Sequence, residues 1–259
     1  MSEPPSTPTR SELEPALCRA ALYRTLSLGL GAAPKQLERF LSCFDPAAVC
    51  AAAARLDRDR ADAVSPAAWR LATVYEGLEP RLLADQLGRL FGHTARGATP
   101  PYETEYQLDA PYSQPQQLAD IGGFYAAFGL RLGSGVHERP DHLSCECEFL
   151  MFLCRKEAFA LEHGDQTMLQ VTRSAQRLFL RDHLGRFAPV FASRALRQDP
   201  EGPCGALADL LLALVRSECA AFQIQCGPSL LELRSADEES VPVACGGCGP
   251  SGPAEPTGP

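Results

Sequence analysis

Apolar residues recur at helical spacing along most of the chain, and this periodicity constrains its fold more than any other feature. Near the start, Leu13, Leu17, Ala20, Ala21 and Leu28 follow one another at intervals that place them on one side of a helix. A sustained run of alternating β-branched residues, the pattern of a half-buried strand, does not occur. The sequence therefore predicts an all-α protein of about nine to ten helices, built as a single domain or as two lobes that share a core.

Prolines mark where many of the helices should begin, because proline is tolerated in the first helical turn. Six of the ten predicted segments start with one. Between the fifth and the sixth, residues 92–114 lose the helical spacing and contain three prolines, which predicts a long loop of the kind that often carries function. The predicted helices span residues 11–28, 34–44, 46–56, 66–78, 80–91, 115–128, 141–163, 165–187, 189–197 and 205–224.

The two ends of the chain differ in composition from the part between them. Residues 1–10 are rich in Pro, Ser and Thr, and ten of the 25 residues in 235–259 are Gly or Pro. Such segments bury too little apolar surface to offset the entropy lost on ordering. We therefore expect a disordered N-terminus at 1–10, a helical domain at 11–234 and a disordered C-terminal tail at 235–259.

The charge and the apolar runs exclude several classes of protein. The net charge of −8 makes nucleic acid an unfavourable partner, because its phosphates would repel an acidic surface. No apolar run approaches the roughly 20 residues that cross a bilayer, so stable membrane insertion is not expected. The N-terminus lacks the basic and apolar regions of a secretory signal, which predicts a cytoplasmic protein. Its eleven cysteines are then expected to be reduced thiols.

One stretch, from Glu138 to Leu153, carries the most chemical information. Pro140 and Asp141 have the character of a helix start, with the Asp141 carboxylate capping free backbone N–H groups. His142 and Glu146 lie four residues apart and so share a helix face. They can be a solvated or paired couple, or two ligands of a metal that would need further ligands.

Two further features allow more than one interpretation. Cys245 and Cys248 are spaced as Cys-Gly-Gly-Cys in the tail, where they can bind a metal, form a redox pair or belong to an unstructured segment. With His142 and Glu146 they support an alternative function, a metal-binding or redox helical protein. His183 is interpreted as a residue that closes the last turns of a helix and bonds to carbonyls.

At this point a family resemblance emerges. The segment around Glu138 to His142 resembles the Glu-x-Pro-Asp-His signature of the TorD/DmsD/NarJ-type molybdoenzyme chaperones, also called redox enzyme maturation proteins. Three other stretches resemble motifs of the same family in the same order. They are Leu90-Phe91-Gly92 with the loop Pro100-Pro101-Tyr102-Glu103-Thr104-Glu105-Tyr106, the helix from Ile121 to Leu130, and the segment from Phe179 to Pro189. The resemblance covers roughly residues 15–230, and the Cys245/Cys248 tail points to a subgroup serving type II dimethyl-sulfoxide-reductase-like enzymes.

The resemblance implies a specific role without catalysis. Family members bind the apo catalytic subunit of a molybdenum oxidoreductase, or its N-terminal twin-arginine leader peptide, until the molybdopterin cofactor is inserted. They act as a monomer or homodimer and need no cofactor of their own. The resemblance implies that the client or its leader is bound by Tyr102, Glu103, Tyr106, Glu138, Pro140, Asp141, His142 and Glu146. In this role Asp141 would accept hydrogen bonds from an arginine, and the two tyrosines would offer apolar faces or else pack beneath the loop.

Overall fold

The computed structural model describes residues 10–31, 34–58, 60, 63–92, 97–106, 114–133 and 138–233. Within these ranges the chain is helical and has no strand, only two isolated β-bridges, so the all-α prediction is confirmed. The elements are α1 (Arg10–Gly29), α2 (Pro34–Cys43), α3 (Pro46–Asp57), α4 (Ser65–Tyr75), α5 (Pro80–Phe91), the 3-10 helix η1 (Glu103–Glu105), α6 (Gln114–Ala127), α7 (Leu143–Glu162), α8 (Gln166–Phe179), the π-helix η2 (Leu180–Leu184), α9 (Gly185–Gln198) and α10 (Pro203–Ala221). The predictions about residues 1–9 and the tail, with Cys245 and Cys248, lie outside the described residues.

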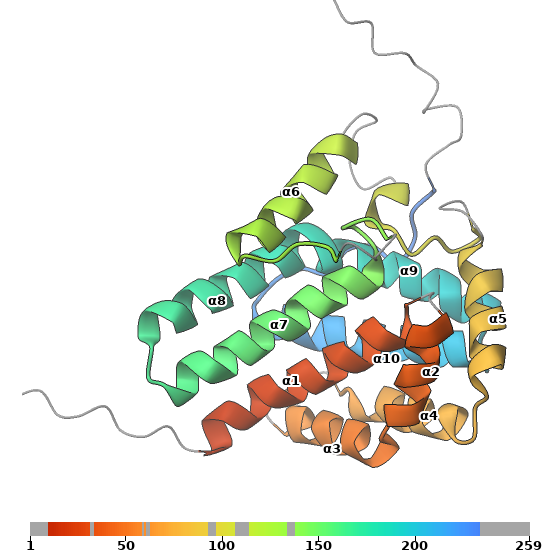
Figure 1. Ribbon diagram of the computed structural model, residues 1–259, viewed down its shortest axis with the longest axis horizontal. Helices are drawn as coiled ribbons and strands as arrows, with labels where there is room; N and C mark the ends of the chain where they lie inside the picture. Colours follow the sequence, from red (N-terminus) through yellow and green to blue (C-terminus); the bar gives the residue numbers. More distant parts are fainter. Residues whose placement is uncertain are drawn as a thin grey trace, which may run out of the picture.

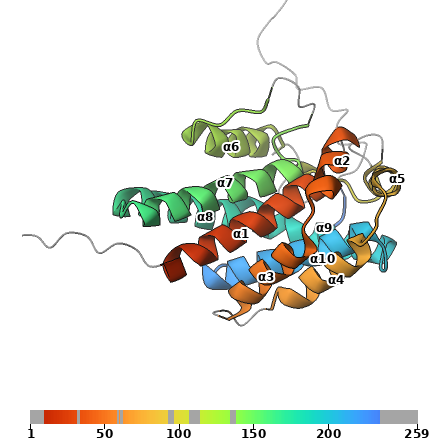
Figure 2. The same cartoon turned by 60° about the horizontal axis from the view of Figure 1, so that its bottom comes forward.

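The helices form a layered bundle around α1, α7 and α10. Helix α1 runs along α7, and α10 packs against α9 (Figure 1). Helices α3 and α4 cover one side of this centre, and α6 lies on the opposite side, above α7 and α8 (Figure 2). The centre is apolar because α10 is buried almost all round, with Leu207, Leu210, Leu211 and Leu214 fully inaccessible. No helix in the described part of the chain is both long and apolar enough to span a membrane.

A buried ionic cluster ties four helices together at one place in this core. Arg19 on α1 donates to Glu157 on α7 at 2.7 Å, to Glu218 on α10 at 2.7 Å and to Gln176 on α8 at 2.6 Å. Its side chain and both carboxylates are almost fully inaccessible to solvent. Because every hydrogen-bonding group here needs a partner from another helix, the cluster fixes how the four helices align.

The predicted break between a helix ending at Phe187 and another starting at Pro189 is wrong. Helix α8 ends at Phe179, continues through the π-helical turn and runs on as α9, with Pro189 inside. Proline cannot donate to the carbonyl four residues earlier, that of Gly185. That carbonyl instead accepts from Gly227 N at 2.9 Å, so the break in the ladder is repaired by another part of the chain.

Candidate functional site

The loop before α6 and the segment leading into α7 are joined backbone to backbone. Leu143 N donates to the Pro101 carbonyl at 2.8 Å, and Glu103 N donates to the Asp141 carbonyl at 3.0 Å. Residues 97–106 and 138–146 therefore form one unit, which we call the loop–helix junction. All eight residues predicted to bind a client lie within it.

Asp141 is the polar centre of the junction, but it does not cap α7 as predicted. Its side chain is fully buried and accepts from Thr104 N at 3.2 Å and from Thr104 Oγ1 at 2.8 Å. The residue at the helix start is His142, whose Nδ1 accepts from Ser144 N at 3.1 Å. Asp141 turns toward the loop because Thr104 of the loop, together with an arginine two residues before Asp141, offers it more donors than the helix start does.

That arginine, Arg139, was not among the predicted site residues. Its guanidinium lies 2.8 Å from Asp141 and 3.0 Å from Glu105, and it stacks over the Tyr102 ring at 4.4 Å. Tyr102 OH donates to Glu138 at 2.7 Å. The side chains of Tyr102, Glu105, Glu138 and Arg139 are only partly buried, so they make up the accessible face of the junction.

The remaining predicted residues mostly lie behind this face. Tyr106 is fully buried, donates to the Pro100 carbonyl at 2.9 Å and packs against Phe187 at 5.0 Å between ring centroids. Burial lowers the pKa of His142, whose Nδ1 is already an acceptor, so the ring is neutral near pH 7. Pro140 offers its carbonyl to Tyr125 OH at 2.8 Å.

Beneath the junction lies a chain of ionisable side chains from four elements. Glu103 Oε2 lies 3.2 Å from His183 Nδ1, and Asp120 Oδ2 lies 3.2 Å from His183 Nε2. Within the described residues His183 Nε2 has no hydrogen-bond partner, so its contact with Asp120 is an ion pair only. Although burial opposes the charge, the hydrogen bond and charge of Glu103, then Asp120, raise the pKa of His183. The prediction that His183 bonds to helix carbonyls is therefore wrong: it faces two carboxylates from distant parts of the chain.

Glu146 completes this chain as a neutral acid. It is fully buried, and burial followed by the charges of Glu103 and Asp141 holds its pKa well above the ordinary value. A buried carboxyl group beside the negative charges of Glu103 and Asp141 is favoured in its neutral form, so it keeps its proton. Glu146 is thus a protonated acid at neutral pH, and a poor ligand for a metal.

Replacing Glu146 with glutamine tests this assignment. Because the folded-state pKa is raised, wild type loses stability as pH rises above the unfolded value of about 4.3. The amide of glutamine has nearly the same shape as the protonated carboxyl group but has no proton to lose. We expect Glu146→Gln to match wild type near pH 4 and to be more stable than wild type at pH 8, measured by denaturant unfolding at both. A variant less stable than wild type at pH 8 would mean that Glu146 is ionised.

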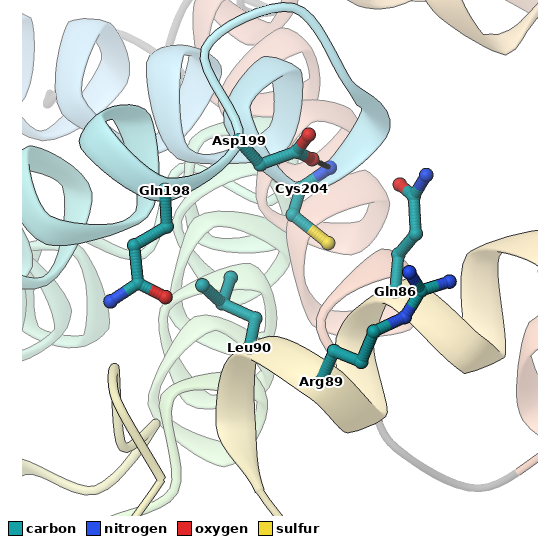
Figure 3. Close-up of a pocket in the computed structure, with 6 residues that line it drawn as sticks. All are labelled: Gln86, Arg89, Leu90, Gln198, Asp199 and Cys204. Atoms are coloured by element: carbon teal, nitrogen blue, oxygen red, sulfur yellow. Dashed lines mark hydrogen bonds between the residues drawn. The ribbon is translucent and has the colours of Figure 1, made fainter.

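A separate polar pocket lies between α5 and the segment that joins α9 to α10. Gln86, Arg89 and Leu90 of α5 face Gln198, Asp199 and Cys204 across a cavity of about 190 Å³ (Figure 3). The Asp199 carboxylate accepts from Cys204 N at 2.9 Å and so caps the start of α10. The amide groups that an anion would use are occupied by this carboxylate. None of the predicted site residues lines the pocket.

The metal or redox alternative gains no support from the described side chains. Among them, no group of three or more His, Cys, Asp or Glu residues is placed to hold a metal ion. Burial raises the pKa of Cys145 to about 12 and that of Cys147 well above its usual value, so both are unreactive thiols at neutral pH.

Comparison with known proteins now adds independent information. Residues 51–193, more than half of the chain, match the model of the nitrate reductase delta subunit family. The chain is 38% identical over 77 residues to the chlorate reductase assembly chaperone protein of Ideonella dechloratans, covering 30% of this chain and 39% of that protein. It shows the same identity and coverage with the selenate reductase assembly chaperone protein of Thauera selenatis.

A longer match is found with the chaperone protein TorD of Vibrio cholerae, 29% identical over 136 residues, which covers 52% of this chain and 60% of the relative. The chain thus spans 39% to 60% of the length of these relatives. The family match includes Tyr102, Asp141, Glu146 and His183, the residues that build the junction and the ionisable chain beneath it. From the helical fold, the ordered motifs and this match, we conclude that the chain belongs to the nitrate reductase delta subunit family, that of the TorD- and NarJ-type chaperones.

Proposed function

We propose that this protein is a cytoplasmic chaperone that binds the apo catalytic subunit of a molybdenum oxidoreductase, or its twin-arginine leader, and assists molybdopterin cofactor insertion before assembly or export. The observation that carries the proposal is the family match over the junction, together with relatives named as assembly chaperones. Relatives named for chlorate, selenate and perchlorate reductases favour a client of the type II dimethyl-sulfoxide-reductase-like group.

The accessible face of the junction suits an arginine-bearing, partly apolar segment. Glu138 and Glu105 supply negative charge, and the partly exposed aromatic ring of Tyr102 lies beside them. A client arginine approaching this face could pair with Glu138 and would compete with Arg139 for Glu105. Such an exchange leaves the Glu105 carboxylate paired and moves the Arg139 guanidinium, which is already partly exposed, toward solvent.

The buried predicted residues would then act indirectly. Asp141, His142, Tyr106, Glu103 and Glu146 are almost inaccessible to solvent, so they would hold the accessible face in place rather than touch a client. We propose that recognition by Tyr102, Glu105, Glu138 and Arg139 depends on this buried support.

The test is calorimetry with the molybdoenzyme catalytic subunit from the same organism, prepared with and without its cofactor. A chaperone that times cofactor insertion must discriminate between the two forms, so we expect at least about tenfold tighter binding to the apo form. The double variant Tyr102→Ala/Glu138→Gln should bind the apo form at least about tenfold more weakly.

Gln198→Ala, in the pocket of Figure 3, serves as the matched control and should bind like wild type. Equal affinity for the apo and mature subunits would rule out a role in timing. An unchanged affinity of the double variant would move the client site elsewhere.

A further inference from the structure

After α10 the chain turns back and runs as a non-helical stretch, residues 224–233, which we call the return segment. Ile224 N donates to the Cys219 carbonyl at 2.8 Å, and Gln223 N donates to the Ala220 carbonyl at 3.1 Å. Gln223 has the positive φ, 55°, that such a turn requires. Together these features make a Schellman motif, which folds Ile224 back beside Cys219.

The return segment lies against the start of α9, and two glycines allow the close approach. Gly227 N donates to the Gly185 carbonyl at 2.9 Å, and a Cβ placed on Gly227 would collide with the Arg186 carbonyl. A Cβ placed on Gly185 would lie 3.1 Å from Cys219 Sγ. The Cys219 sulfur and the backbone next to Cys226 therefore converge on the same glycine, Gly185.

The side chains of Cys219 and Cys226 meet at this place, and both are thiols. Cys219 is buried in the core, whereas Cys226 lies at the edge of the core and is partly accessible. A hydrogen bond with the Cys226 side chain, followed by burial, raises the pKa of Cys219. Cys219 thus keeps its proton and shares it with the Cys226 sulfur. Because sulfurs that share a proton are already neighbours, an S–S bond of about 2.05 Å requires only a local shift.

The far end of the return segment reaches the loop of the loop–helix junction. Leu233 forms a β-bridge with Tyr106, and the blue trace in Figure 1 runs from α10 toward that loop. Arg194 of α9 donates to the Leu231 carbonyl at 3.5 Å and to the Ala98 carbonyl at 3.4 Å. The return segment therefore connects the two thiols at one end with the loop before α6 at the other.

We propose that Cys219 and Cys226 are the site of a reversible disulfide, which fixes the return segment onto α9 and restrains the loop that this segment contacts. The oxidant is a small-molecule disulfide of the glutathione class. Two separate placements carry the proposal: the Schellman motif folds the chain back beside Cys219, and Gly227 is bonded to Gly185 next to the Cys219 sulfur. The inference concerns the state of the chain itself and does not depend on the proposed function.

The exchange begins at Cys226, because Cys226 is the accessible member of the pair. Its thiolate attacks one sulfur of the small-molecule disulfide, expels one thiol and forms a mixed disulfide. The Cys219 sulfur then loses its proton, attacks the Cys226 sulfur and expels the second thiol. The chain gives up two protons and two electrons, and the oxidant becomes two thiols. The raised pKa of Cys219 makes the second step the slower one.

Peptide mapping of the full chain tests whether the bond forms. The chain carries Cys245→Ser/Cys248→Ser, so that the tail thiols take no part, and is incubated with oxidised glutathione. We expect a peptide that links Cys219 to Cys226, preceded by a mixed disulfide at Cys226, and dithiothreitol should separate the link again. Absence of this link would overturn the proposal, whether Cys226 stays a thiol, keeps its glutathione or joins another cysteine.

Hydrogen exchange of the same chain tests whether the bond restrains the return segment. The Gly227 amide is bonded to the Gly185 carbonyl, so it exchanges when the segment opens. We expect this exchange to be at least about tenfold slower in the disulfide form than in the reduced form, and slower exchange also in residues 97–106. After the same treatment Cys226→Ser should show no change, whereas Cys43→Ser, which removes an exposed thiol of α2, should respond like the parent chain. Equal exchange in the two forms would overturn the restraining role.

Discussion

Replacing Arg19 with methionine is expected to lower the free energy of unfolding by about 3 kcal/mol. This is the largest loss of stability that we predict for a single replacement. Removing one partner of a buried ion pair typically costs about 3–5 kcal/mol, because the opposite charge stays buried without compensation. Each glutamate of the cluster has a second arginine partner that the replacement does not remove. Glu218 pairs with Arg60 at 2.6 Å, and Glu157 pairs with Arg173 at 2.7 Å. These outer arginines place the expected loss at the lower end of the range.

Urea unfolding followed by circular dichroism measures this loss. The matched control is Arg55→Met, because Arg55 pairs at 2.9 Å with Glu14, whose side chain is about half exposed. A pair that faces solvent contributes no more than about 1 kcal/mol. Similar losses for the two variants would show that the Arg19 cluster contributes no more than a surface pair.

Replacing Asp141 with alanine should cost about 2–3 kcal/mol and release the loop of residues 97–106. The buried carboxylate accepts from the Thr104 backbone and hydroxyl and from Arg139, and each lost hydrogen bond to a charged group is expected to count. The helical bundle should remain folded, because its apolar core does not include Asp141. Cleavage within the loop by a nonspecific protease, together with the melting temperature, reports the two effects separately.

Glu105→Ala is the matched control for this second prediction. Arg139 pairs with both Glu105 and Asp141, but only the Asp141 side chain also accepts a hydrogen bond from the loop backbone, at Thr104 N. We expect its removal to cost no more than about 1 kcal/mol and to leave the loop resistant to protease. If Asp141→Ala left the loop equally resistant, the backbone bonds alone would hold the junction together.

The helical fold could be predicted from the sequence because its signals are local. Periodic apolar residues and prolines in first turns act within a few residues, and most predicted helices coincide with observed ones to within a few positions. The exception is Pro189, where the helix continues because Gly227, nearly forty residues further on, supplies the missing donor. A local signal cannot contain that information.

The site could be predicted only as a set of residues, not as an arrangement. The family resemblance indicated the two segments that meet at the junction. It did not show that Asp141 turns inward, since this depends on Thr104 and Arg139 acting together. The pairing of His183 with Glu103 joins residues 80 positions apart and has no spacing signature. A histidine, two glutamates and an aspartate scattered along a sequence look the same whether they lie apart or are brought together by the fold.

The π-helical turn between α8 and α9 allows one extra residue between the core-facing residues of the two helices. Phe179 and Phe187 both face the core, although eight residues of regular α-helix would set them about 80° apart in phase. The wider turn absorbs roughly one residue, so the two helices stay in phase around an insertion. A chain one residue shorter would keep both phenylalanines inward through ordinary winding. What it would lack is a buried position in the turn itself, which His183 uses to reach Glu103. The core packing of α8 and α9 therefore does not need the position of His183, but the contact with Glu103 does.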